Sequence, residues 1–297
     1  MEILEPFAAY PALFIGCSLV LGLLIGSFLN VVIFRVPVMM ENALRAECAA
    51  LADPEAPPPP RFNLVTPHSH CPACKAPVTA LQNIPVVSWL ALGRKCASCK
   101  APISARYPLV ELATGVLTGF VAWHFGFGST ALLAMAFTWF LIALTMIDFD
   151  TQFLPDQITY PLLWLGLLAS LWHPVWSMGA APVTPRDAIM GAAAGYLSLW
   201  TVFWLFKLLT GKEGMGYGDF KLFAALGAWL GWKMLLPIIL FASVVGAVFG
   251  VVVMIRQRRG KDTPMAFGPF LAIAGWLAMM FGHDVVERYL RLFVHQD

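Results

Sequence analysis

Eight long apolar runs constrain this chain more than any other feature of its sequence. A helix needs roughly 20 apolar residues to cross a bilayer, and several runs approach that length. They lie at residues 12–34, 107–125, 130–147, 158–172, 188–209, 220–235, 237–255 and 267–281. Charged residues make up only 12% of the chain, about half of the usual share in soluble domains. The sequence therefore predicts an all-α polytopic membrane protein with about eight transmembrane helices.

One sizeable polar region separates the first apolar run from the second. We expect three parts: an N-terminal transmembrane helix at residues 1–34, an insert at 35–106, and a seven-helix membrane core at 107–297. Since only Pro237 breaks the sixth run from the seventh, a total of seven helices is the alternative. Within the insert, the proline-rich stretch 52–61 is expected to be extended or irregular, because proline fixes φ and removes a backbone donor.

Basic residues are unevenly distributed between the two faces that alternating helices create. The face that bears the insert receives 15 of the 19 Lys and Arg residues. Because such an excess is typical of cytoplasmic loops, the insert and the loops on its side are predicted to face the cytoplasm. The net charge of +2 does not indicate a nucleic-acid partner, and the expected surroundings are the lipid bilayer.

Four cysteines in the insert have the spacing of a zinc site. Cys71 and Cys74 form one C-x2-C pair, and Cys96 and Cys99 form a second. This spacing lets the backbone turn so that both sulfurs of a pair reach one ion, and two pairs supply tetrahedral ligation. Four thiolates leave no open coordination position, so the predicted zinc is structural and folds an insert with little apolar content.

Other interpretations of these cysteines remain open from the sequence. Two disulfides are disfavoured in a reducing cytoplasm, and a redox pair lacks the βαβ context it would need. An iron–sulfur site would use the same type of ligand. His68 and His70 are close enough in sequence to replace a cysteine, although exposed loop histidines are the simpler interpretation.

Two acidic motifs lie at the ends of apolar runs, on the face predicted to be cytoplasmic. The motif IDFDTQFLPD contains Asp148, Asp150 and Asp156, and GMGYGD ends in Asp219. A carboxylate at a membrane boundary costs free energy unless it is solvated, paired or facing a cavity, so these residues are functional candidates. The alternative is structural: Asp148 marks a helix end, and Asp156 and Asp219 cap helices.

Three glycines before Asp219 favour a functional role over simple capping. Gly214, Gly216 and Gly218 permit φ > 0 and lack side chains, so the loop suits close approach by another backbone or a substrate. Two aspartates on facing helices would share one proton, because adjacent carboxylates do not ionise together. Such a pair acts as general base and general acid, activating water against a peptide carbonyl and protonating the leaving amide.

The ordered set of motifs resembles the prepilin peptidases, the G-x-G-D class of membrane aspartic proteases. Besides the cysteine pairs and the acidic motifs, the matching stretches are residues 26–37, 104–115 and 264–276. The resemblance implies a multi-pass enzyme of the bacterial inner membrane. It would cleave the leader of type IV prepilins and type II secretion pseudopilins after glycine, then methylate the new N-terminal residue, usually phenylalanine, with S-adenosylmethionine.

The resemblance also implies the catalytic residues. It maps the catalytic pair onto Asp148 and Asp219, and we assign orienting or capping roles to Asp150 and Asp156. The turn PMAFGP, residues 264–269, is expected on the same face, either lining the cleft or simply opening a helix.

The residues that bind the methyl donor are not predicted. No G-x-G-x-x-G motif follows a predicted strand, so a Rossmann-type site is not visible. Asn30, Arg35 and Glu111 lie near the membrane roots of the insert. They are as consistent with interfacial snorkelling and interhelical hydrogen bonds as with substrate or cofactor binding.

Three alternatives to the bifunctional enzyme follow from the same residues. The first is a peptidase without methyltransferase activity. The second is an ion-coupled transporter whose carboxylates relay protons, for which acidic residues near the bilayer midplane and inverted repeats are expected. The third is a scaffold whose zinc module recruits partners, which has no need of the glycine-flanked Asp219. The oligomeric state is not predicted.

Overall fold

The computed structural model describes residues 5–53, 61–172, 183–212, 214–257 and 266–294, the last twelve by their backbone alone. Most of the proline-rich stretch expected to be irregular, residues 54–60, lies outside this description, as do residues 258–265, which include three of the counted basic residues and the start of the PMAFGP turn. The chain divides into two compact units, Met1–Ala131 and Leu132–Asp297. The division by function at residues 34 and 106 stays a prediction.

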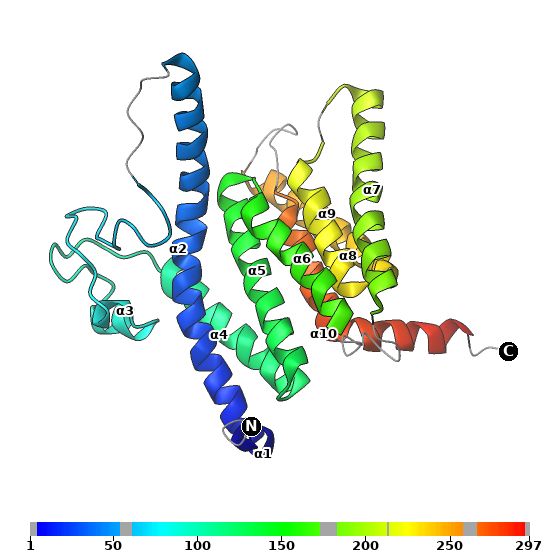
Figure 1. The fold of residues 1–297 in the computed structure, drawn as a ribbon, viewed down its shortest axis with the longest axis horizontal. Helices are drawn as coiled ribbons and strands as arrows, with labels where there is room; N and C mark the ends of the chain where they lie inside the picture. The colour runs from blue at the N-terminus through cyan, green and yellow to red at the C-terminus, as the bar shows by residue number, and fades with distance from the viewer. Residues whose placement is uncertain (1–4, 54–60, 173–182, 213, 258–265, 295–297) are drawn as a thin grey trace. The chain divides into compact units, whose positions relative to one another are not determined.

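Each of the eight predicted apolar runs contains most of one helix (Figure 1). These helices are α2 (Pro11–Ala52), α4 (Arg106–Phe125), α5 (Ser129–Thr151), α6 (Asp156–Trp172), α7 (Pro185–Thr210), α8 (Tyr217–Leu230), α9 (Leu235–Gln257) and α10 (Gly268–Val294). Within the described residues there is no β-strand, only isolated bridges. The all-α class is therefore confirmed.

Five of the described helical segments are long and apolar enough to cross a membrane on their own. They are α2, α4, α5, α7 and the segment Trp232–Arg256. By contrast, α6 has 17 residues, α8 has 14, and the apolar part of α10 is Gly268–Gly282. A total of eight crossings therefore stays a prediction, because it needs these shorter helices to span the bilayer inside a helical bundle.

The break between the sixth and seventh runs differs from the prediction. It lies at Gly231, which adopts φ 75° and ψ 165° and is followed by the 3₁₀ turn η3 (Trp232–Met234). Glycine reaches this conformation without a side-chain penalty. Pro237, expected to be the break, lies instead in the first turn of α9, where its missing N–H group costs no helical hydrogen bond.

The first unit is built on the packing of α2 against α4. A Cβ added at Gly22 would lie 2.6 Å from Thr118 Oγ1, and one at Gly26 would lie 2.7 Å from Glu111 Cα. The two helices therefore approach closely where α2 has no side chains, as is common for helix pairs in membranes. A short helix, α1 (Glu5–Ala9), precedes α2, and Phe7 stacks on Phe127 just beyond α4.

Helix α2 is longer than the apolar run that predicted it. Its 42 residues correspond to about 63 Å, roughly twice the thickness of a hydrocarbon core. It continues through Pro37 to Ala52, where the prediction placed the start of the insert at residue 35. The added residues are mainly Ala, Leu, Met and Glu, which are strong helix formers, and Glu41 pairs with Arg45 one turn later.

Helix α8 is the centre of the second unit. It contacts α6, α7, α9 and α10, and its side chains from Leu222 to Leu230 are all buried. Trp229 donates a hydrogen bond to the Leu162 carbonyl of α6 and packs on Phe137 of α5. On the α7 side, the backbones of Gly191 and Gly227 meet directly. The N-terminal turn of α8, which bears Asp219, is thus fixed by a packed helix.

Candidate active site and metal centre

The four predicted zinc ligands come from two loops of the same local structure. In the first loop the Cys71 N–H donates to the Ala76 carbonyl at 2.9 Å, and in the second the Cys96 N–H donates to the Ala101 carbonyl at 2.8 Å. The residue after each pair, Lys75 or Lys100, adopts a positive φ. The repeated sequence C-x2-C-K-A-P thus folds twice into the same turn.

The four sulfur atoms converge. They all lie within 4.8 Å of one another, with 3.8 Å between the sulfurs of Cys71 and Cys99 and 4.0 Å between those of Cys74 and Cys96. These separations are nearly twice a disulfide bond length. They match the spacing of about 3.8 Å that tetrahedral ligation by four sulfurs at about 2.3 Å implies. The cluster therefore fits zinc by donor type, number and spacing.

The backbone of each loop favours the thiolate that a metal requires. The N–H groups of Cys74 and Ala73 lower the pKa of the Cys71 thiol. The N–H groups of Cys99 and Ser98 lower the pKa of Cys96 to about 6. Neither His68 nor His70 belongs to the cluster; instead, the His70 ring lies 3.0 Å from the His68 carbonyl oxygen.

The polar residues at the membrane roots hold the insert to its two helices. Arg35 is buried and donates to the carbonyls of Asn63 at 2.8 Å and Pro67 at 2.6 Å. Glu111, also buried, accepts a hydrogen bond from the Val86 N–H. Asn30 donates to the Tyr107 carbonyl. These contacts favour the structural interpretation that the sequence left open.

Asp148 lies in the last turn of α5 with its carboxylate buried. Its Oδ2 atom is shielded from solvent, and no group within the described residues makes a hydrogen bond to it. A Cβ added at Gly268, the first residue of α10, would lie 2.5 Å from this oxygen. The glycine of the PMAFGP turn thus places bare backbone against Asp148. A buried oxygen without a partner is unusual and calls for a functional explanation.

Asp219 lies in the first turn of α8 and is also buried. The residue that caps this helix is Gly216, and Asp219 is three positions further, so the predicted alternative of Asp219 as N-cap is wrong. The Asp219 carboxylate is near enough to that of Asp148 for their charges to repel. The structure therefore brings together the two aspartates that the resemblance paired.

Two of the three glycines before Asp219, Gly214 and Gly218, serve close packing. None of them is among the residues with positive φ in the described chain, contrary to one part of the prediction. A Cβ at Gly218 would lie 2.7 Å from Leu154 Cβ, and one at Gly214 would lie 2.9 Å from the Phe206 ring. Leu154 also lies against Gly268. The Leu154 side chain thus lies against Gly218, which precedes Asp219, and against Gly268, which contacts Asp148.

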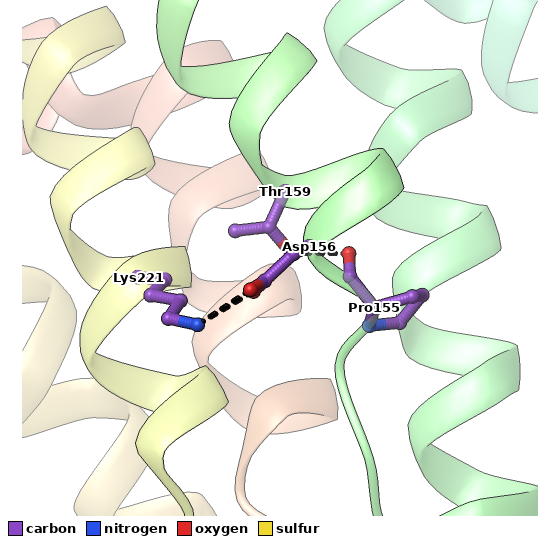
Figure 2. A network of polar contacts seen from close by, with 4 residues as sticks. All are labelled: Pro155, Asp156, Thr159 and Lys221. Carbon is purple, nitrogen blue, oxygen red and sulfur yellow. Dashed lines mark hydrogen bonds and ion pairs between the residues drawn. The ribbon is translucent and has the colours of Figure 1, made fainter. Parts of the chain in front are cut away.

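The other two acidic residues of the first motif have different surroundings. Asp156 is the first residue of α6, and its two carboxylate oxygens lie 2.7 and 2.8 Å from Lys221 Nζ of α8 (Figure 2). Pro155 accepts the first backbone hydrogen bonds of α6 and that of the Thr159 hydroxyl. Asp156 therefore does not cap its helix. Asp150 is exposed.

Sequence reasoning missed two contributors to this region. Leu154 lies inside the first acidic motif but is apolar, and Lys221 follows Asp219 by two residues. The lysine was visible as a basic residue near the start of a largely apolar run, and such a residue needs a partner. Its partner, 65 positions earlier in the chain, was not visible.

Several membrane-capable helices, a four-cysteine cluster and a pair of buried aspartates define a polytopic membrane protein with an aspartic-protease type of site. Residues 20–125 match the bacterial peptidase A24 N-terminal domain, and residues 135–251 match the type IV leader peptidase family. The second match contains both aspartates, and the first contains all four cysteines.

Similar proteins cover the chain nearly from end to end. Prepilin leader peptidase/N-methyltransferases of Stutzerimonas stutzeri and Pseudomonas aeruginosa are each 52% identical over 98% of this chain, covering 99% and 98% of their own lengths. One of Neisseria gonorrhoeae is 49% identical over 93% of this chain and 92% of its own. No solved structure matches the chain. The chain belongs to the type IV leader peptidase family, so the resemblance read from its motifs is confirmed.

Proposed function

We propose that this protein cleaves the leader peptide of type IV prepilins with Asp148 and Asp219 as its catalytic pair, and then methylates the new N-terminus. The observation that carries the catalytic assignment is the buried, unpartnered oxygen of Asp148 beside the charge of Asp219. Membership of the leader peptidase family favours this function over the transporter and scaffold alternatives.

The pair supplies both proton transfers of peptide hydrolysis. One carboxylate takes a proton from water as the water oxygen attacks the scissile carbonyl carbon. The other, protonated, carboxylic acid donates its proton to the leaving nitrogen as the C–N bond breaks. Gly268 lies against Asp148 Oδ2 and Gly216 lies against Asp219 Oδ2. Neither glycine places a side chain beside these carboxylates, so the peptide backbone of a substrate can approach them.

The test is cleavage and methylation by the full-length enzyme in nanodiscs. Asp148→Asn and Asp219→Asn should each abolish leader removal from a synthetic prepilin-type peptide, while a peptide supplied already cleaved is still methylated. Glu47→Gln is the control, because this exposed carboxylate lies on the extension of α2, and it should process the peptide nearly as well as the native enzyme. Normal cleavage by either asparagine variant would overturn the assignment.

Zinc at the cysteine cluster and S-adenosylmethionine as methyl donor belong to the same proposal. Zinc bound by Cys71, Cys74, Cys96 and Cys99 would have a structural role, since four thiolates complete its coordination. Elemental analysis of the purified protein should give one zinc per chain, and an iron–sulfur absorbance would contradict this. Transfer of labelled methyl from S-adenosylmethionine to a cleaved peptide tests the donor.

Location and the wider substrate range also follow as proposals. The inner membrane is the location that the family resemblance implies, and the excess of basic residues on the insert side supports an orientation with both sites facing the cytoplasm. The same chemistry would process type II secretion pseudopilins. The family resemblance implies that these, like type IV prepilins, have an apolar N-terminal helix behind a basic leader. Protease accessibility of the insert in inverted against right-side-out vesicles tests the orientation.

A further inference from the structure

The zinc-bearing insert is attached to its two membrane helices at different levels. Asn30 of α2 bonds the Tyr107 carbonyl, so these residues mark a common level at the start of α4. Arg35 lies five residues further along α2, about 7.5 Å away from the bilayer, and binds the carbonyls of Asn63 and Pro67. The segment 63–67 is therefore expected to lie farther from the bilayer than the start of α4.

The opposite edge of the insert is attached within the span itself. Glu111, in the second turn of α4, accepts a hydrogen bond from the Val86 N–H at 2.7 Å. Because helical side chains tilt toward the N-terminus, Val86 lies at the level of the first two turns of α4. The short helix α3 (Val87–Ala91) begins at the next residue. Because α4 is long and apolar enough to cross a membrane, we expect α3 at the depth of the headgroup region.

Apolar side chains at this edge are exposed. Leu81 is 77% exposed, Val87 60% and Leu90 61%. The short 3₁₀ turn η2 (Leu81–Asn83) and α3 have no buried residues, and together they present an apolar surface. At membrane depth such a surface is stable when it meets lipid.

The charge of the insert complements one class of lipid. Residues 61–106 include six Lys or Arg residues and no Asp or Glu. Two of them, Arg94 and Lys95, follow α3 directly, and the Arg94 guanidinium lies 5.0 Å from the Trp89 ring. Apolar side chains beside basic ones are typical of segments that bind anionic membranes at the interface.

We propose that residues 81–95 lie in the membrane interface and bind anionic phospholipids. Leu81, Val87 and Leu90 enter the boundary between headgroups and acyl chains, while Arg94 and Lys95 contact lipid phosphates. The lipid surface thereby adds to the hydrogen bonds with α2 and α4 that hold the insert.

Photocrosslinking in nanodiscs of the full-length protein tests this proposal. Benzoylphenylalanine in place of Leu90 should give phospholipid adducts, detected by mass spectrometry. The matched control is the same substitution at Val65, which is 71% exposed but lies between the two carbonyls that Arg35 binds. Equal lipid adducts at the two positions, or adducts at Leu90 with a prepilin peptide or a second copy of the chain, would overturn the proposal.

Varying the charge of the lipids provides a second test of the same proposal. Adducts at Leu90 should increase when phosphatidylglycerol replaces part of the phosphatidylcholine, and Arg94→Gln with Lys95→Gln should remove that increase. The control Arg45→Gln removes a basic residue from the extension of α2, where it pairs with Glu41, and should leave the increase intact. Zinc content verifies that each insert is folded. An increase that persists in the Arg94/Lys95 variant would contradict phosphate binding by these residues.

A separate observation concerns the ion pair between Asp156 and Lys221. Lys221 Nζ lies 2.7 and 2.8 Å from the two Asp156 oxygens and 5.3 Å from the Tyr160 ring centroid. Asp156 and Tyr160 are four residues apart on one face of α6. The lysine of α8 is therefore held by two groups of α6, of which Figure 2 shows Asp156.

This ion pair connects the segments that carry the two aspartates. Asp148 lies in the last turn of α5, and a turn that contains buried Leu154 leads from this helix to Asp156. Lys221 follows Asp219 by two residues in the first turns of α8. A fixed distance between Asp156 and Lys221 thus limits how far the Asp148 segment can move from Asp219.

We infer that Asp156 and Lys221 are positioning residues for the catalytic pair, an inference that rests on the proposed function of Asp148 and Asp219. Asp156→Asn and Lys221→Met should each lower kcat about 10- to 100-fold, since small displacements of reacting groups cost this much. KM should stay nearly constant because neither side chain is assigned to substrate binding. Lys221→Arg should restore most of the kcat.

The outcomes separate this inference from the proposed function. If Asp148→Asn and Asp219→Asn abolish cleavage but Asp156→Asn and Lys221→Met retain native kcat, the positioning role alone is wrong. If the first two variants cleave normally, the catalytic assignment itself fails. Lys212→Met, at an exposed lysine before α8, is the control. A fall in thermal midpoint that accounts for the lost activity, without rescue by arginine, would also contradict positioning.

Discussion

The two functional regions of this protein are assembled in contrasting ways. The cysteine cluster lies in one insert, and its four ligands fall between residues 71 and 99. Asp148 and Asp219 are separated by two intervening helices, α6 and α7, and meet because α8 is packed at the centre of the second unit. The cluster is therefore a local structure completed by a metal, whereas the aspartate pair is a product of helix packing.

This difference in assembly predicts which substitutions each site tolerates. The insert has few buried apolar residues, so its stability depends on the cluster and on anchors such as Arg35 and Glu111. The aspartate site depends on backbone contacts, for which Gly191, Gly218 and Gly268 leave the space. A lost ligand should unfold one region only, and an added methyl group should disturb only the other.

The largest expected effect is loss of a zinc ligand. Cys96→Ser should abolish stoichiometric metal binding and unfold the insert, because structural zinc sites contribute about 10 kcal/mol or more to folding. Leader cleavage should persist, since both aspartates lie in the other unit. Zinc content, limited proteolysis of the insert and peptide cleavage are measured on the same preparation.

Cys48→Ser is the matched control for that change. This cysteine is exposed on the extension of α2 and lies outside the cluster, so its replacement should leave zinc content and proteolysis unchanged. Unchanged zinc content in Cys96→Ser would contradict four-thiolate ligation.

A single methyl group should have the next largest effect when it is placed beside Asp148. In Gly268→Ala the new Cβ would lie 2.5 Å from Asp148 Oδ2, so the carboxylate or the start of α10 must shift. A displacement of this kind should lower kcat/KM about 100-fold, while zinc content stays native. Cleavage kinetics and elemental analysis measure the two quantities.

The control for the added methyl is Gly16→Ala. No atom lies within 4 Å of the Cβ position at Gly16 in α2, and this variant should cleave like the native enzyme. Native kcat/KM in Gly268→Ala would show that the backbone at Gly268 is not needed close to Asp148.

The contrast between the regions also explains what the sequence reveals. The cysteine cluster was predictable because each pair falls within one turn of chain, and the repeated C-x2-C-K-A-P needs no distant partner. The aspartates were recognisable as candidates from their position at span ends, but their pairing required resemblance to a family. Close contact of Gly218 with Leu154, and the Asp156–Lys221 pair, depend on helix packing that periodicity does not encode.

Some helix boundaries differ from the predicted ones for local reasons that apolar content alone does not reveal. The extension of α2 beyond residue 34 consists of good helix formers, so propensity rather than hydropathy was the useful signal there. Helix α6 falls short of a full span, as its short run in the sequence indicated. Helix α8 is short because Gly231 ends it inside the sixth run. The break at Gly231 was missed because proline is tolerated in a first helical turn.

A smaller effect is expected where two helices of the second unit touch through glycine. A Cβ at Gly191 of α7 would lie 2.2 Å from the Gly227 carbonyl oxygen of α8. Gly191→Ala should therefore destabilise the protein by about 1–3 kcal/mol, the usual range for overpacking, as a lower thermal midpoint in detergent. In Gly119→Ala the nearest atom would be 3.5 Å away, an ordinary contact, so this control should keep the native midpoint. Equal midpoints would contradict the close α7–α8 contact.

The smallest expected effect concerns a hydrogen bond that links α5 to α10 away from the aspartates. Trp276 Nε1 donates to Thr138 Oγ1 at 3.0 Å, and the same hydroxyl donates to the Ala134 carbonyl within α5. In a double-mutant cycle, Trp276→Phe and Thr138→Val should show a coupling energy of about 1 kcal/mol, the usual net value of one such bond. Thr138→Ser keeps the hydroxyl and should retain the coupling. Because Trp276 lies eight residues beyond Gly268 on α10, the native kcat should survive all three changes. A large loss of kcat would instead show that the aspartate site depends on the whole α5–α10 contact rather than on the packing at its own end.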